Sequence, residues 1–238
     1  MNLLDIVSKI EQTWSSNISN LEIKDVEYDS RLVKKGSLFI CVKGPQDDGH
    51  LFIEQALDNG AVALVVSQEF IDTASSNKDY KKSFDRIKKE KIPIVSVKDP
   101  ISAVSKMSAQ FYDHPSRSLN VIGVTGTNGK TSTVFMIESI MNDAGMKTGI
   151  IGTILYRYGG REIREIEYTT PKSLYLQRIM SDMVKDNVTH LAMEVSSHGI
   201  ELGRVWDIDF DVAIFTHLTR DHMEFHKDMD DYFNAKKK

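Results

Sequence analysis

The sequence contains little cysteine, no long apolar run and no excess of positive charge. A single cysteine among 238 residues excludes intrachain disulfides and favours a cytoplasmic setting. No run of about 18 apolar residues is present to span a membrane. The first residues carry Asp5 and Glu11 within their apolar pattern, which is typical of an amphipathic helix rather than a signal peptide. The formal net charge of −4 gives no reason to expect nucleic acid or an anionic membrane as a partner.

The composition that remains is that of a soluble globular protein, 41% hydrophobic and 27% charged. The length has room for one large domain or two ordinary ones. Cys41 lies in the apolar segment 36–42, so we interpret it as a small core residue rather than a nucleophile. The lysine-rich stretch 69–91 is interpreted as a solvated loop and an exposed helix, without a function.

Apolar periodicity predicts two α/β parts, which we place at 1–99 and 100–238. In the first part it predicts helices over 1–14 and 50–60 and strands over 36–42, 61–67 and 92–97. In the second part it predicts helices over 101–112, 131–145 and 173–187, strands over 118–126, 147–154, 190–196 and 210–216, and a hairpin over 155–168 that turns at Gly159 and Gly160. This alternation is typical of a mostly parallel sheet.

The strongest motif is a glycine-rich loop between a predicted strand and a predicted helix, Gly123-Val-Thr-Gly-Thr-Asn-Gly-Lys-Thr131. Such a loop turns backbone N–H groups toward a polyphosphate, and the helix N-terminus adds partial positive charge. We expect Lys130 to reach the β and γ phosphates and the Thr131 hydroxyl to hold Mg²⁺. The strict pattern has glycine in place of Val124, so the motif departs at one position. The loop predicts ATP or GTP binding through Gly126, Thr127, Asn128, Gly129, Lys130, Thr131 and Ser132.

Further segments, taken with this loop, resemble one family. Gly126-Thr-Asn-Gly-Lys-Thr131 is similar to the loop of the Mur ligase and folylpolyglutamate synthase superfamily. The other matching segments are Tyr28-Asp-Ser-Arg31, Gly36-Ser-Leu-Phe39, Gly44 through Asp48-Gly49-His50, Thr169-Thr170-Pro171, Met193-Glu-Val-Ser-Ser-His198, Gly203-Arg204, Thr219-Arg-Asp-His222 and Asp231-Tyr-Phe-Asn-Ala-Lys236. Together they cover nearly the whole chain and identify it as similar to the Mur ligases.

The resemblance implies a fold and a reaction. Mur ligases join a small α/β domain that binds a uridine nucleotide to a phosphate-loop α/β ATPase domain. They phosphorylate a carboxylate with ATP, and an amine then attacks the acyl phosphate. The segments are most similar to those of the Mur ligases that act in peptidoglycan synthesis and extend UDP-N-acetylmuramoyl-L-alanyl-D-glutamate. These enzymes add lysine or diaminopimelate as the third residue of the peptide. No obligate protein partner is implied.

The resemblance also implies catalytic and metal-binding residues. Lys130, Glu194, His222 and Lys236 would be catalytic, and Thr131 would join the last three as ligands of two Mg²⁺ ions. Lys236 matches the lysine that forms a carbamate with CO₂, a reaction that needs a neutral amine and is favoured by partial desolvation. Among the other histidines, His198 is interpreted as structural or pocket-lining, and His217 and His226 have weaker claims.

The resemblance also implies which residues contact the substrate. Ser30, with the loop from Gly44 to Asp48, would bind the uridine diphosphate. The muramoyl dipeptide would contact Thr169, Thr170, Ser196 and Arg204, whose planar guanidinium can bind a carboxylate through two hydrogen bonds. Taken without the resemblance, Ser30 and Thr169 would be turn or cap residues, Arg204 a surface ion pair and Lys236 part of a frayed basic tail.

Two departures accompany the resemblance. The family has asparagine where this chain has His217, and Mur ligases continue well beyond the carbamate lysine. We therefore expect a fragment with little ligase activity alone and an unpaired sheet edge. The choice between lysine and diaminopimelate stays open. The alternatives are a ligase that adds D-alanyl-D-alanine, a folylpolyglutamate synthase, a simple phosphate-loop kinase and a non-catalytic nucleotide-binding module.

Overall fold

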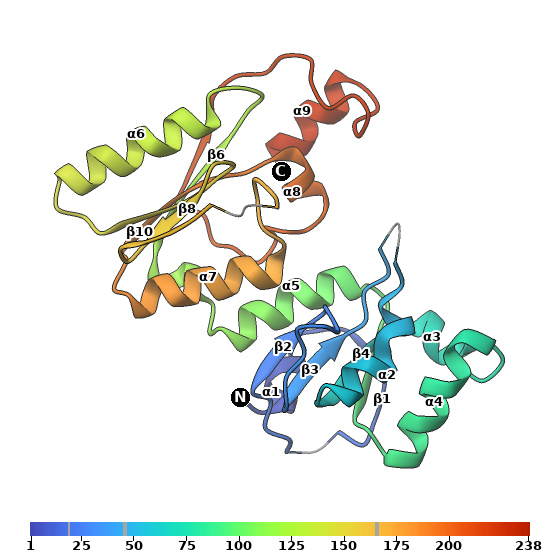
Figure 1. The fold of residues 1–238 in the computed structure, drawn as a ribbon. Coiled ribbons are helices and arrows are strands. Elements are labelled where there is room, and N and C mark those ends of the chain that lie inside the picture. Colours follow the sequence, from blue (N-terminus) through green and yellow to red (C-terminus); the bar gives the residue numbers. More distant parts are fainter. Residues whose placement is uncertain (19, 45–46, 165–166) are drawn as a thin grey trace. The chain divides into compact units, whose positions relative to one another are not determined.

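The computed structural model of the chain has two compact units, Met1–Phe111 and Tyr112–Lys238, each built around its own sheet (Figure 1). It describes residues 1–18, 20–44, 47–164 and 167–238. The boundary that we placed at residue 99 or 100 falls at the start of helix α5 (Pro100–Phe111), which packs against α1 (Leu3–Val7) and β4 (Ala61–Ser67) within the first unit. Among these residues no helix has the length and apolar character needed to cross a bilayer.

The first unit contains a five-stranded sheet in the order β1-β5-β4-β3-β2. Its strands are β1 (Gln12–Ser16), β2 (Asp25–Glu27), β3 (Ser37–Ile40), β4 and β5 (Ile94–Val97), and its further helices are η1 (Gly49–Phe52), α2 (Ile53–Asp58), α3 (Gln68–Thr73) and α4 (Lys78–Glu90). Strands β5, β4, β3 and β2 pair in parallel, and β1 pairs antiparallel with β5. Cys41 is fully buried in the core, as predicted, and burial raises the pKa of its thiol.

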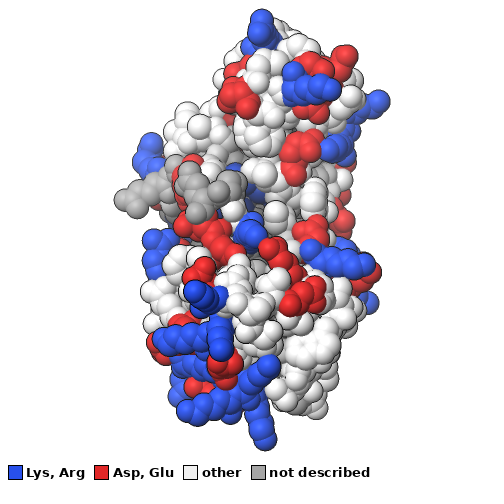
Figure 2. Space-filling model, turned by 90° about the vertical axis from the view of Figure 1, so that its right-hand side faces the viewer, with Lys and Arg blue, Asp and Glu red and all other residues white. Residues whose placement is uncertain are grey.

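Two predictions for this unit were wrong in detail. The helix expected over residues 1–14 ends at Val7, and residues 12–16 form β1 because the edge of β5 supplies hydrogen-bond partners that outweigh the local pattern. The stretch 69–91 contains two helices, α3 and α4, rather than a loop and one helix. Its exposed lysines were predicted correctly: Figure 2 shows basic side chains, with acidic ones between them, at the lower end of the view, where α4 lies in Figure 1.

The second unit contains a six-stranded sheet in the order β11-β6-β10-β7-β8-β9. Its strands are β6 (Asn120–Thr125), β7 (Thr148–Ile151), β8 (Tyr156–Tyr158), β9 (Arg161–Ile163), β10 (His190–Glu194) and β11 (Val212–Phe215). Its helices are η2 (Pro115–Ser118), α6 (Lys130–Asp143), α7 (Ser173–Lys185), α8 (Ser197–Glu201) and α9 (Met229–Lys237). Strands β8 and β9 form the predicted hairpin, and Gly159 and Gly160 adopt positive φ at its turn.

Four neighbouring strands of this sheet, β11, β6, β10 and β7, run parallel. Their carboxyl ends therefore meet along one edge, where open α/β sheets bind ligands. Buried Met180, Leu191 and Met193 pack below this edge in the main core. Within the described residues, strand β11 lies at one side of the sheet, with Val212 and Phe215 exposed.

Candidate active site

The glycine-rich loop lies between β6 and α6, at the carboxyl edge of the sheet. Gly126 and Gly129 have φ of 137° and 87°, and a Cβ at Gly126 would collide with the Thr216 hydroxyl. The Lys130 ammonium donates hydrogen bonds to the carbonyls of Gly126 and Thr127, both at 2.9 Å. Burial lowers the pKa of Lys130, against the opposing effect of Glu194 and Asp221. The loop and its lysine thus have the arrangement expected of a polyphosphate cradle.

Glu194 is the last residue of β10, and only 1% of it is exposed. Its Oε1 accepts hydrogen bonds from the Thr131 hydroxyl at 2.9 Å and the Thr153 amide at 2.8 Å, and the Thr153 hydroxyl lies 3.2 Å from Oε2. A Cβ at Gly152 would collide with this carboxylate. Thr131 and Glu194 therefore present oxygen atoms side by side, as a Mg²⁺ ion requires. Thr153 was missed from the sequence because it follows β7 without a motif.

The residues predicted to hold the dipeptide surround Glu194. The Thr170 hydroxyl donates to the Glu194 carbonyl at 3.0 Å and accepts from the Ser196 amide at 3.0 Å, while Arg204 donates to the Thr170 carbonyl at 2.9 Å. Thr170 is fully buried, so it orients its neighbours from behind the site. Tyr168, which we did not predict, lies with its ring centre 4.2 Å from the Arg204 guanidinium.

One cavity of about 490 Å³ unites these groups. It is lined by Thr127, Asn128, Gly129, Lys130, Thr131, Thr153, Glu167, Tyr168, Thr169, Glu194, Ser196, His198, Arg204 and His222. Predicted nucleotide, metal and dipeptide contacts that are far apart in the sequence therefore share one space.

Lys236 lies on α9 and is 6% exposed, close to the glycine-rich loop. Its ammonium donates to the Gly126 carbonyl at 3.1 Å and lies 4.6 Å from the ring centre of Tyr232. Burial and the nearby charge of Lys130 lower the pKa of Lys236 to about 8, against the opposing effect of Asp221. Lys236 is thus a buried amine beside the loop rather than part of a frayed tail.

Four histidines of the second unit have distinct surroundings. His222 lines the cavity with a left-handed backbone (φ 55°). His198, interpreted as structural or pocket-lining, also lines it, with its ring centre 4.0 Å from that of Phe225. Burial, with His222 and His226 nearby, lowers the pKa of His198. His226 is buried, and its Nε2 lies 2.9 Å from the hydroxyl of Ser197. This contact connects the segment before α9 with the first residue of α8. His217 contributes its backbone carbonyl, which accepts from the Thr127 amide at 2.7 Å, while its side chain is exposed.

The predicted uridine-binding residues of the first unit make internal hydrogen bonds. The Ser30 hydroxyl donates to the Gln55 side chain at 2.7 Å. Asp48 lies 2.6 Å from His50 Nδ1 and accepts a hydrogen bond from the Tyr80 hydroxyl. Gly44 donates its amide to the Asp47 carbonyl at 2.8 Å, and residues 45 and 46 of the predicted loop lie outside the described residues.

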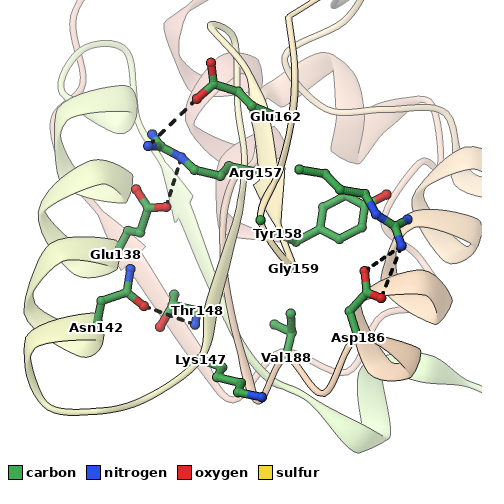
Figure 3. A pocket seen from close by; sticks show the side chains of 12 residues that line it. Glu138, Asn142, Lys147, Thr148, Arg157, Tyr158, Gly159, Glu162, Asp186 and Val188 are labelled. Carbon is green, nitrogen blue, oxygen red and sulfur yellow. Dashed lines mark hydrogen bonds and ion pairs between the residues drawn. The ribbon is translucent and has the colours of Figure 1, made fainter.

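A second cavity, of about 570 Å³, lies at the opposite ends of the strands, near Thr148 at the start of β7. Figure 3 shows Arg157 reaching toward Glu138 and Glu162, at 3.2 Å and 3.9 Å. Arg161 pairs with Asp186 at 3.1 Å. These arginines are already neutralised by carboxylates, and the lining includes no residue of the predicted sites. The first cavity is therefore the candidate active site.

Comparison with known proteins gives matches over both units. Residues 124–238 match the Mur ligase middle domain, and residues 22–112 match the Mur ligase family, catalytic domain. A relative from Clostridium botulinum, named UDP-N-acetylmuramoyl-L-alanyl-D-glutamate–2,6-diaminopimelate ligase, is 42% identical over 99% of this chain and 46% of its own length. The ligase of the same name from Halalkalibacterium halodurans is 44% identical over 98% of this chain and 45% of its own length.

A solved structure of a ligase with this name matches 99% of the chain with a TM-score of 0.74 and 25% identity. The match covers 44% of that structure. The chain thus spans less than half the length of these relatives. Residues 124–238, which match the middle domain, include every residue that lines the candidate active site.

Proposed function

Because the chain belongs to the Mur ligase family, we propose that it carries the nucleotide, metal and dipeptide sites of a ligase that extends UDP-N-acetylmuramoyl-L-alanyl-D-glutamate. The added residue would be diaminopimelate rather than lysine, because the relatives at 42% and 44% identity carry diaminopimelate in their names. The observation that carries the proposal is the single cavity, which places the phosphate loop beside Glu194 and Arg204. A cytoplasmic setting accords with the single, buried cysteine.

The proposed reaction has two steps. A carboxylate oxygen of the dipeptide attacks the γ-phosphorus of ATP and ADP leaves; the amine nitrogen of the incoming residue then attacks the acyl carbon, phosphate leaves and the amine loses a proton. Lys130 and the N-terminus of α6 would screen the phosphate oxygens, which otherwise repel the attacking carboxylate. Mg²⁺ held by Thr131 and Glu194 would supply further neutralisation, and their adjacent oxygens fit such an ion.

Arg204 is the proposed contact for the dipeptide's free carboxylate. Its guanidinium is oriented from two sides, by the Thr170 carbonyl and by the Tyr168 ring. Thr169 and Ser196 would donate further hydrogen bonds from the cavity wall. In the first unit, Ser30 and the segment from Gly44 to Asp48 would hold the uridine diphosphate, with Ser30 exchanging its bond to Gln55 for one to the ligand.

Lys236 is the proposed site of a carbamate that would join His222 and Glu194 at a second Mg²⁺ ion. The amine nitrogen attacks the carbon of CO₂ and loses a proton. A lysine whose pKa is about 8 is neutral in about a tenth of the molecules at pH 7, far more often than an ordinary lysine. The buried position beside the loop supports this assignment.

The proposal is tested by calorimetric titration of the chain with UDP-N-acetylmuramoyl-L-alanyl-D-glutamate and, as control, with UDP-N-acetylmuramoyl-L-alanine. We expect the dipeptide form to bind more tightly, since Arg204 and its neighbours contact the added glutamate. Arg204→Gln should remove that preference. Arg117→Gln, which alters an exposed arginine paired with Asp209, should keep it. Equal affinity for both ligands in the folded wild type would exclude the third-residue assignment.

A further inference from the structure

Three side chains with metal-binding atoms meet at the edge of the candidate active site: His198, His222 and Glu224. Each offers one ligand atom, and these atoms all lie within 4.8 Å of one another. His222 Nδ1 lies 3.3 Å from Glu224 Oε1, and the two imidazole rings pack edge to face with centres 5.0 Å apart. The proposed ligase chemistry uses neither His198 nor Glu224 as a ligand.

The spacing of one pair of these ligand atoms already fits a small tetrahedral ion. Bonds of about 2.0–2.2 Å to nitrogen and oxygen place tetrahedral ligand atoms about 3.3–3.5 Å apart. The His222–Glu224 pair already has this separation. A change in the side-chain torsions of His198 would close the remaining gap, because its ligand atom lies at most 4.8 Å from the other two.

The environment of His222 directs one ring nitrogen toward this position. Its Nε2 lies 3.5 Å from Asp221 Oδ2, while Nδ1 faces Glu224. Metal-binding histidines commonly direct the second ring nitrogen at a carboxylate, which fixes the tautomer and the ring orientation. Asp221 is itself held because its Oδ1 accepts the backbone amide of His222 at 2.9 Å.

We propose that His198, His222 and Glu224 form a site for a divalent transition metal such as Zn²⁺, separate from the oxygen-rich Thr131–Glu194 pair. Two imidazoles and one carboxylate suit Zn²⁺ or Co²⁺, whereas Mg²⁺ prefers oxygen ligands. Both histidines line the cavity, so a fourth coordination position would open onto it for water or a ligand oxygen. If His222 also serves Mg²⁺, as the proposed function has it, Zn²⁺ and Mg²⁺ compete for that side chain.

The site is tested with Zn²⁺ and Co²⁺ alone, on the whole chain and without nucleotide. We expect one Zn²⁺ per chain by calorimetry in excess Mg²⁺, and an intense visible absorption from tetrahedral Co²⁺. His198→Gln and Glu224→Gln should each weaken Zn²⁺ binding by about tenfold or more. His190→Gln, at the opposite end of β10 from Glu194, and Glu69→Gln, in the first unit, should bind as the wild type does.

Thermal unfolding followed by circular dichroism establishes that each variant is folded before its affinity is compared. Wild-type affinity in both His198→Gln and Glu224→Gln would overturn the proposal, as would a weak absorption typical of octahedral Co²⁺. Neither outcome bears on the ligase proposal, because the dipeptide titration contains no transition metal. Loss of dipeptide discrimination with retained Zn²⁺ binding would remove the ligase proposal and leave this one standing.

Discussion

Lys236 combines a buried position with a charge, and this combination carries a free-energy cost. The side chain is 6% exposed, and its pKa of about 8 lies well below that of an unfolded lysine. Desolvation of the ammonium is the main cause, and Lys130 adds repulsion. A residue selected for stability alone would not be charged here, so the functional proposal explains why a lysine stands at this position.

Replacing Lys236 by methionine is expected to stabilise the second unit at pH 7 by about 1–3 kcal/mol in CO₂-free buffer. Below pH 8 the Lys236 amine is protonated in both the folded and the unfolded wild type. The whole free-energy cost of burying the ammonium is therefore present there. Between the folded pKa of about 8 and the unfolded value of about 10.4, the unfolded chain binds more protons. Wild-type stability therefore rises with pH across this window, and the advantage of the variant disappears.

Urea denaturation from pH 7 to pH 10.5 measures this difference, and the exposed neighbour Lys237→Met serves as the control. The control should follow the wild type at every pH. The opposite result would be a Lys236→Met variant that is less stable than the wild type at pH 7, by a margin that does not change with pH. It would contradict a free-energy cost of burying the Lys236 ammonium.

Helix α4 ends in an unfavourable backbone conformation. The C-cap residue Lys91, directly after Glu90, has φ 54° and ψ 39°, and its amide donates to the carbonyls of Ile87 and Lys88. A side chain in the left-handed region costs about 1–2 kcal/mol, which glycine avoids, although glycine also loses more entropy on folding. Lys91→Gly is therefore expected to stabilise the first unit by about 0.5–1 kcal/mol.

The matched comparison is Asn187→Gly, since Asn187 has φ 59° just after α7 in the second unit. Asparagine tolerates this conformation better than lysine does, so its replacement should give a smaller gain. Chemical denaturation of both variants gives the two differences in the free energy of unfolding. A destabilised Lys91→Gly chain would show that the lysine side chain makes a contact that outweighs the backbone strain.

Elements with strong local patterns were predictable from the sequence, and long-range pairings were not. The apolar runs of β4 and β6 and the glycine turn of the hairpin were identified because neighbouring residues alone determine them. Strand β1 was missed because its pairing with β5 connects segments about eighty residues apart.

The same distinction holds within the site. The position of Glu194 at a strand end could be predicted, whereas its bonds to Thr153 depend on the packing of β7 against β10. The bond from Lys236 to Gly126 joins residues separated by 110 positions. No local pattern could reveal it, and the resemblance suggested the proposed role of Lys236 without indicating its contacts.

The two units have separate cores, and the candidate nucleotide site lies wholly in residues 112–238. Ligand binding stabilises the folded region that forms its site, by about 2.7 kcal/mol at a free concentration one hundred times the Kd. We expect Mg²⁺ and a non-hydrolysable ATP analogue to slow amide hydrogen exchange in β6, α6 and β10, with no change in β3 or β4. Protection of the first unit to the same extent would contradict independent units.

The carbonyl oxygen of Gly126 accepts hydrogen bonds from the ammonium groups of both Lys130 and Lys236. Two like charges thus share one acceptor and raise each other's electrostatic energy. A carbamate on Lys236 would reverse the sign of one partner and convert this repulsion into attraction beside the phosphate loop. The dissolved gas CO₂ would then act as a solute that tunes nucleotide affinity, and the loop would respond to the bicarbonate content of its surroundings as well as to ATP and metal.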